Sequence, residues 1–219
     1  MDKKIKVKDP GSALTHFIAM VLAVCAAAPL LYKAYKGINN SYMGAFATFI
    51  ISMICLYAAS TIYHTFDISE KVNKLLRKID HAMIFVLIAG SYTPICIIAL
   101  PKNVGIPLLI TVWGITIVGT IFKICWITCP HWLSSAMYIG LGWLCVVAFS
   151  SIFNSLSRAA FMWLLVGGII YTIGGIIYAL KLPIFKKHNW KNFGNHELFH
   201  CFVMLGSLCH FILVYQYLA

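Results

Sequence analysis

Seven long apolar stretches, separated by short polar connections, dominate the pattern of the chain. Each runs for about 20 residues with few charges, which is the length that an α-helix rising 1.5 Å per residue needs to cross the hydrocarbon core of a membrane. The strands of a β-barrel are shorter and alternate in polarity, so they do not fit this pattern. The sequence therefore predicts an all-α bundle of seven transmembrane helices, at residues 12–32, 41–63, 79–100, 104–124, 133–153, 159–180 and 195–218.

The composition agrees with this fold class. Hydrophobic residues make up 61% of the 219-residue chain and charged residues 11%, whereas a soluble domain carries about a quarter charged residues. The connections are too short for a second folded unit, which predicts one membrane domain over residues 1–219 with a basic tail at 1–11. Four glycines in the sixth stretch predict close helix packing, because small residues let membrane helices approach. They are Gly167, Gly168, Gly174 and Gly175.

The net charge of +11 is spread unevenly over the connections. With the N-terminus inside the cell, thirteen lysines and arginines fall on the cytoplasmic side and four outside, and such a bias sets the orientation of membrane proteins. We therefore expect a cytoplasmic N-terminus, an extracytoplasmic C-terminus and a multi-pass location in the cell membrane. The basic face is expected to contact anionic lipid headgroups, and no nucleic acid is needed to explain it. The thirteen are Lys3, Lys4, Lys6, Lys8, Lys71, Lys74, Arg77, Lys78, Lys123, Lys181, Lys186, Lys187 and Lys191, and the four are Lys33, Lys36, Lys102 and Arg158.

Histidines gather at the predicted cytoplasmic ends of the stretches. His196 and His200 are one helical turn apart at the start of the last stretch, so both imidazoles lie on one helix face and are spaced to bind one metal ion. His64, at the end of the second stretch, is the candidate third ligand. Three protein ligands and an open position for water form the catalytic type of zinc site. The alternative is that the histidines are separate interfacial residues that bond to the backbone or to headgroups.

Two further polar residues lie at the same predicted depth. Ser60, one turn before His64, is expected to hold a water or orient a ligand. Asp80, at the start of the third stretch, is expected to hold a water at the metal and act as its general base. Ionisable groups at such a depth are costly and are usually paired or functional, so the set predicts a site.

Three ordered motifs resemble those of the haemolysin III family, the prokaryotic branch of the progestin and adiponectin receptor proteins. They are Ser-Thr-Ile-Tyr-His at 60–64, Asp-His-Ala-Met-Ile-Phe at 80–85 with Ala-Gly-Ser-Tyr-Thr-Pro at 89–94, and His-Glu-Leu-Phe-His at 196–200. The likeness covers nearly the full chain. It implies seven helices with a cytoplasmic N-terminus and an inner-leaflet zinc ion. It also implies that His64, His196 and His200 bind this ion and that Asp80 lies beside the water at the zinc.

The chain departs from the family pattern just before the first stretch. Many relatives carry Glu-x-x-Asn there, whereas this sequence reads Asp-Pro-Gly-Ser from Asp9 to Ser12, so no role is assigned to these two residues. His16 is interpreted as satisfying a helix neighbour, and His81 as a packing residue or an outer partner of the site. His210 lies about 21 Å along its helix from the first ligand of the last stretch, which is too far to share the ion.

The residues leave three classes of function open. The first is a zinc-dependent hydrolase of an amide or ester bond in a lipid, as the family's resemblance to alkaline ceramidases implies. The second is a non-enzymatic membrane protein with structural zinc, acting in membrane-property control, sensing or cytolysis. The third is an intramembrane metalloprotease, because His-Glu-x-x-His is the signature in which the glutamate, here Glu197, is the general base. The presence of Ser60 and Asp80 favours the first class, since a structural zinc usually has four protein ligands.

Overall fold

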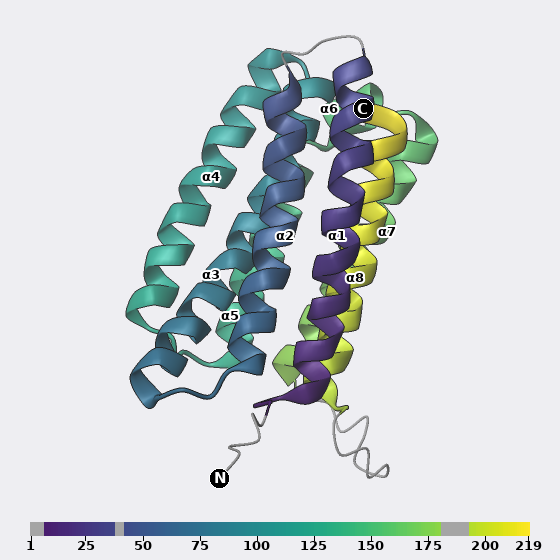
Figure 1. Ribbon diagram of the computed structural model, residues 1–219. Coiled ribbons are helices and arrows are strands. Elements are labelled where there is room, and N and C mark those ends of the chain that lie inside the picture. Colours follow the sequence, from purple (N-terminus) through teal and green to yellow (C-terminus); the bar gives the residue numbers. More distant parts are fainter. Residues whose placement is uncertain (1–6, 38–41, 181–192) are drawn as a thin grey trace.

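The computed structural model describes residues 7–37, 42–180 and 193–219, and these residues form helices with no strand among them. Seven helical segments in the described ranges are long and apolar enough to span a membrane. Figure 1 shows them as one elongated bundle. The elements are α1 (Pro10–Lys36), α2 (Met43–Thr65), α3 (Glu70–Pro94), a π-helical turn (Ile95–Ala99), α4 (Lys102–Cys125), α5 (His131–Gly142), a 3₁₀ turn (Trp143–Ala148), α6 (Phe149–Ser155), α7 (Arg158–Leu180), α8 (Asn195–Leu213) and a π-helical turn (Val214–Leu218).

All seven predicted stretches coincide with helical spans, so the predicted fold class is confirmed. Two departures from the prediction have a physical reason. The third span begins at Glu70, where the hydroxyl of Ser69 caps the helix by accepting the N–H of Val72 at 3.3 Å. Residues 70–78 are rich in charge. A prediction that follows apolar residues therefore misses this first part of the helix. The fifth span is not one helix, because a 3₁₀ turn at Trp143–Ala148 separates α5 from α6.

The chain order largely decides which helices are neighbours. α1 packs on α2, α2 on α3 and α3 on α4, while α7 packs on both α5 and α8. Contacts between α1 and α8 bring the first and last spans together, and Figure 1 shows these two helices side by side, with the start of α1 and the C-terminus near opposite ends of the bundle. Many large apolar side chains of the spans point outward. An apolar exterior of this kind suits lipid, and the chain is a multi-pass membrane protein.

Glycines let α7 and α8 approach closely. A Cβ on Gly167 would lie 2.5 Å from the ring of His210, and one on Gly174 would lie 2.6 Å from the Cβ of Phe202. Both distances are below any real contact, so larger side chains would push the helices apart. The packing role predicted for these glycines is therefore confirmed. Gly168 differs, because a Cβ there meets nothing within 4 Å in the described part of the chain.

Candidate metal centre

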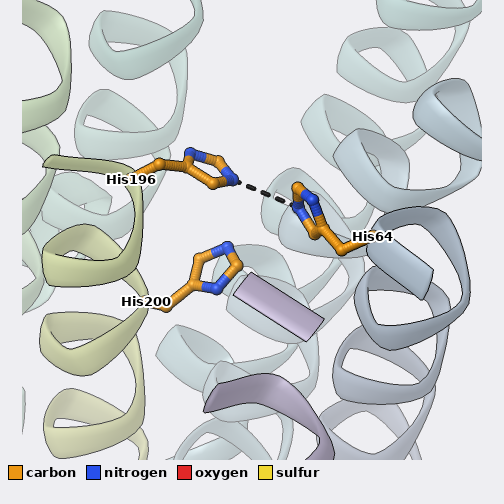
Figure 2. A group of neighbouring side chains, drawn as sticks. All are labelled: His64, His196 and His200. Atoms are coloured by element: carbon orange, nitrogen blue, oxygen red, sulfur yellow. Dashed lines mark hydrogen bonds between the residues drawn. The ribbon is translucent and has the colours of Figure 1, made fainter. Parts of the chain in front are cut away.

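The fold brings three histidines from two helices to one point. His64 lies in the last turn of α2, and His196 and His200 lie in the first two turns of α8. One ligand nitrogen from each lies within 4.8 Å of the others. The Nε2 atoms of His64 and His196 are 3.1 Å apart. Figure 2 shows the rings of the α8 pair facing the ring from α2 across the gap between the helices.

The start of α8 fixes the placement of its two histidines. Gly194 precedes the helix, and its N–H donates to Oε2 of Glu197 at 2.8 Å, as in a capping box. Such a cap fixes the first helical turn because it satisfies a backbone donor that has no partner inside the helix. With the first turn fixed, the four-residue spacing of His196 and His200 directs both rings to the same side.

The donor set fits a zinc ion. Zinc accepts imidazole nitrogen at 2.0–2.1 Å in a tetrahedral arrangement, so two nitrogens on one ion are about 3.3 Å apart. His64 and His196 already have nearly this spacing, and the third nitrogen lies within 4.8 Å. The rings of His64 and His200 are buried, with 4% and 2% of the residue exposed. Three close imidazoles away from water are unfavourable as cations, which favours neutral rings with lone pairs for a metal.

Asp80 and Ser60 border the same cavity as His196 and His200, although Asp80 lies ten residues after the start of α3 and not at its start as predicted. Both are buried, Asp80 on α3 and Ser60 on α2 one turn before His64. An oxygen of Asp80 lies 3.3 Å from Nδ1 of His81, which is therefore a direct partner of the carboxylate. The hydroxyl of Ser60 has no hydrogen-bond partner in the described ranges. A buried hydroxyl of this kind is available to a water or a ligand.

A cavity of about 190 Å³ runs from this group into the interior of the bundle. Ser60, Asp80, His196 and His200 border its polar end. The remaining wall consists mostly of apolar side chains from α3, α5, α6, α7 and α8, among them residues as distant along the chain as Leu87 and Phe161. The candidate metal centre therefore opens into an apolar chamber.

The residue that carried the protease alternative is engaged elsewhere. Besides the N–H of Gly194, the carboxylate of Glu197 accepts a short hydrogen bond from the hydroxyl of Ser12 on α1. Each of the two carboxylate oxygens therefore has a partner, one at the start of α1 and one at the start of α8. No role of Ser12 was predicted, because its contact with Glu197 spans 185 positions of the chain and leaves no local pattern.

Two more contacts from the start of α1 were missed in the sequence. Oδ2 of Asp9 lies 3.0 Å from Nδ1 of His64, and Oγ1 of Thr15 lies 3.0 Å from Nδ1 of His200. The only signal in the sequence is the three-residue spacing of Asp9, Ser12 and Thr15 at the start of a helix. That spacing places polar groups on one helix face but does not say what they meet.

His16 and His210 lie outside the group of three. His16 stacks on His200, with ring centroids 3.5 Å apart and an interplanar angle of 11°, and both of its ring nitrogens are without a partner in the part of the chain that the structure describes. His210 packs beside Gly167, well along α8 from the metal centre. Both residues border the cavity.

Known proteins are similar to this chain over nearly its whole length. A sequence model of the family described as haemolysin-III related matches residues 5–211. The chain is 36% identical to Hemolysin-3 of Bacillus cereus over 211 residues, which cover 96% of this chain and 91% of that protein. It is 35% identical to the Hemolysin-3 homolog of Bacillus subtilis (strain 168) over 210 residues, or 96% and 94%. The adiponectin receptor protein of Drosophila melanogaster is more distant, 22% identical over 219 residues that cover 93% of this chain and 49% of that protein.

Proposed function

Because the chain belongs to the haemolysin-III related family, with seven spans and a buried histidine group, we propose that it is a zinc-dependent lipid hydrolase. His64, His196 and His200 hold the zinc ion, and the substrate is a membrane lipid with an amide or ester bond. One observation carries this proposal: His196 and His200 border an apolar cavity together with a carboxylate and a hydroxyl that has no partner among the described residues. A zinc that only braces helices needs no such chamber.

The ligand count supports a catalytic zinc. The group of His, Cys, Asp and Glu side chains found in the described ranges has three members, and three protein ligands with one open position are typical of catalytic sites, whereas structural sites usually have four. When bound, zinc polarises a carbonyl and lowers the pKa of a water that it holds to about 7.

Two residues of the cavity supply the rest of the chemistry. Asp80 accepts a proton from the water as its oxygen attacks the carbonyl carbon, and then returns that proton to the departing nitrogen or oxygen. Ser60 donates a hydrogen bond to the water or to the carbonyl oxygen and so orients them. The products are a carboxylic acid and an amine or an alcohol, so one water is consumed for each bond that is cleaved.

The cavity walls support a lipid as the substrate. The scissile bond lies at the polar end beside Asp80, and the acyl chain extends along the apolar wall that α3, α5 and α7 provide. A protease is disfavoured, since both oxygens of Glu197 already accept hydrogen bonds that hold helix ends. A general base must be within hydrogen-bond reach of the water, and Glu197 is not among the residues that border the cavity.

The test compares Asp80→Asn with the unchanged protein, purified in detergent and placed in vesicles with N-acyl lipids or ester lipids. We expect the variant to keep its zinc and to lose about 10²–10⁴-fold in rate, the usual contribution of a general base. Asp67→Asn is the matched control, because Asp67 is an exposed carboxylate that accepts a hydrogen bond from Asn73 at 2.7 Å outside the cavity. Zinc-loaded protein that gives no chelator-sensitive product from either lipid class contradicts the hydrolase and favours the non-enzymatic alternative.

A further inference from the structure

Three polar side chains at the start of α1 contact the histidines of the metal centre or the residue beside them. Asp9 contacts His64 and Thr15 contacts His200, each at 3.0 Å from Nδ1 of the ring. Ser12, between them, donates to Glu197, the neighbour of His196. The first span therefore touches both helices that carry the histidines.

The contact of Asp9 determines where the proton of His64 lies. An ionised carboxylate only accepts hydrogen bonds, so the imidazole must donate from Nδ1, and its lone pair is then on Nε2. That atom is the one that faces His196, at 3.1 Å from its Nε2. The backbone N–H of Asp9 also donates to the carbonyl oxygen of His64 at 2.8 Å. This second bond holds Asp9 next to the histidine that its carboxylate contacts.

Thr15 acts on His200 by a parallel route. Its hydroxyl has one hydrogen, and the carbonyl oxygens of Gly11 and Ser12 lie 3.1 and 2.9 Å from Oγ1. Carbonyls only accept, so the hydroxyl donates to the backbone, and its oxygen is left to accept the Nδ1–H of the imidazole. The lone pair of His200 is therefore also on Nε2.

We propose that Asp9 and Thr15 are positioning residues of the zinc site, which fix the tautomer and the ring orientation of His64 and His200. The inference deepens the proposed function and rests on it. Partners that accept the second N–H of a metal-binding histidine orient the ring and make it a better ligand, and losing one typically lowers metal affinity or activity by 10–100-fold. The metal centre is thus built from three helices, although only two carry its ligands.

The experiment measures zinc affinity against a competing chelator for the full chain in detergent, and then the visible spectrum after replacement of zinc by Co²⁺. Asp9→Ala and Thr15→Val should each weaken zinc binding by about 10–100-fold and should shift the Co²⁺ bands, because the donor strength of one imidazole changes. Thr15→Ser keeps the hydroxyl and should restore both the affinity and the spectrum.

Two variants control for effects on the helix ends alone. Lys8→Ala disturbs the same segment, since Lys8 lies over the ring of Tyr63, 3.7 Å from its centroid, and its side chain makes no hydrogen bond to a histidine ring among the described residues. Thr61 lies about one turn before His64, and Thr61→Val removes a hydroxyl whose only hydrogen bond among the described residues is to the carbonyl oxygen of Tyr57. Neither should change the affinity or the Co²⁺ bands.

The results separate this inference from the proposed function. If the unchanged protein binds one zinc ion and Asp9→Ala and Thr15→Val match it in affinity and spectrum, the positioning role is wrong while the zinc site stands. Weakening by these variants no greater than that by Lys8→Ala, with unshifted Co²⁺ bands, also overturns it. An unchanged protein that binds no zinc overturns both proposals.

Discussion

A leucine at Gly168 should block turnover while leaving the metal in place. Gly168 lies on the face of α7 that lines the cavity, together with Leu164, Tyr171 and Gly175, which recur at the three- and four-residue spacing of one helix face. A Cβ at this position meets nothing within 4 Å among the described residues, so the substitution does not strain the backbone. The added side chain instead extends into a space of about 190 Å³.

The size of the effect follows from sterics. A lipid tail is already in apolar surroundings in the bilayer, so little hydrophobic burial is gained or lost when it enters the cavity. Forcing extra methylene groups into a filled site costs about 1–3 kcal/mol, which is about 5- to 150-fold in rate at 1.36 kcal/mol for each factor of ten. We therefore expect kcat/KM to fall within that range for long-chain lipids, and to fall less for lipids with short chains.

The matched control is Gly114→Leu on α4. A Cβ there also meets nothing within 4 Å in the described structure, and Gly114 is exposed and does not line the cavity. The assay measures zinc content and kinetics for both variants with lipids of graded chain length. If Gly168→Leu keeps its zinc and hydrolyses every chain length at the unchanged rate, the cavity does not hold the substrate, and the main support for the hydrolase is lost.

The other predictions concern orientation, metal content and packing. Reporters fused to the two ends of the chain should place the N-terminus inside the cell and the C-terminus outside, because of the uneven spread of basic residues; finding both on one side rules out the predicted topology. Purified protein should hold about one zinc ion, and the double variant His64→Ala, His196→Ala should hold almost none after dialysis against a chelator, whereas full occupancy would refute the assignment. Gly174→Ala should lower the thermal unfolding midpoint in detergent, since its Cβ would lie 2.6 Å from Phe202, and Gly44→Ala, which has open space, should not.

The spans and the shared helix face of His196 and His200 were predictable because both depend on local rules. Hydropathy locates a helix in a membrane, and the four-residue spacing of His196 and His200 orients two rings whatever surrounds them. The motif at 60–64 then supplied the third partner. The residues alone left the contact of His64 with this pair open, because a shared depth of helix ends does not place them in contact.

The remaining features depend on contacts between distant parts of the chain. The partner of Glu197 is Ser12, and the partner of His64 is Asp9, which lies 55 positions away; neither separation leaves a periodic signal. The 3₁₀ turn at Trp143–Ala148 lies in a span whose mean hydropathy of 1.9 equals that of the spans at Met43–Thr65 and Asn195–Leu218, so hydropathy alone predicts one continuous helix. The cavity cannot be predicted from hydropathy for the same reason, since its wall combines side chains from seven helices, all but α4.

The meeting of α2 and α8 at the histidine group has a consequence for the order in which the site forms during synthesis. The Asp9–His64 contact needs only the first two spans, whereas His64 and His196 are separated by 132 positions. At a synthesis rate of 5–20 residues per second, the ribosome needs roughly 7–26 s to add the intervening chain. The histidine group is thus completed only when the final span is inserted, so a chain truncated before α8 lacks two of the three rings, however well its earlier helices have assembled.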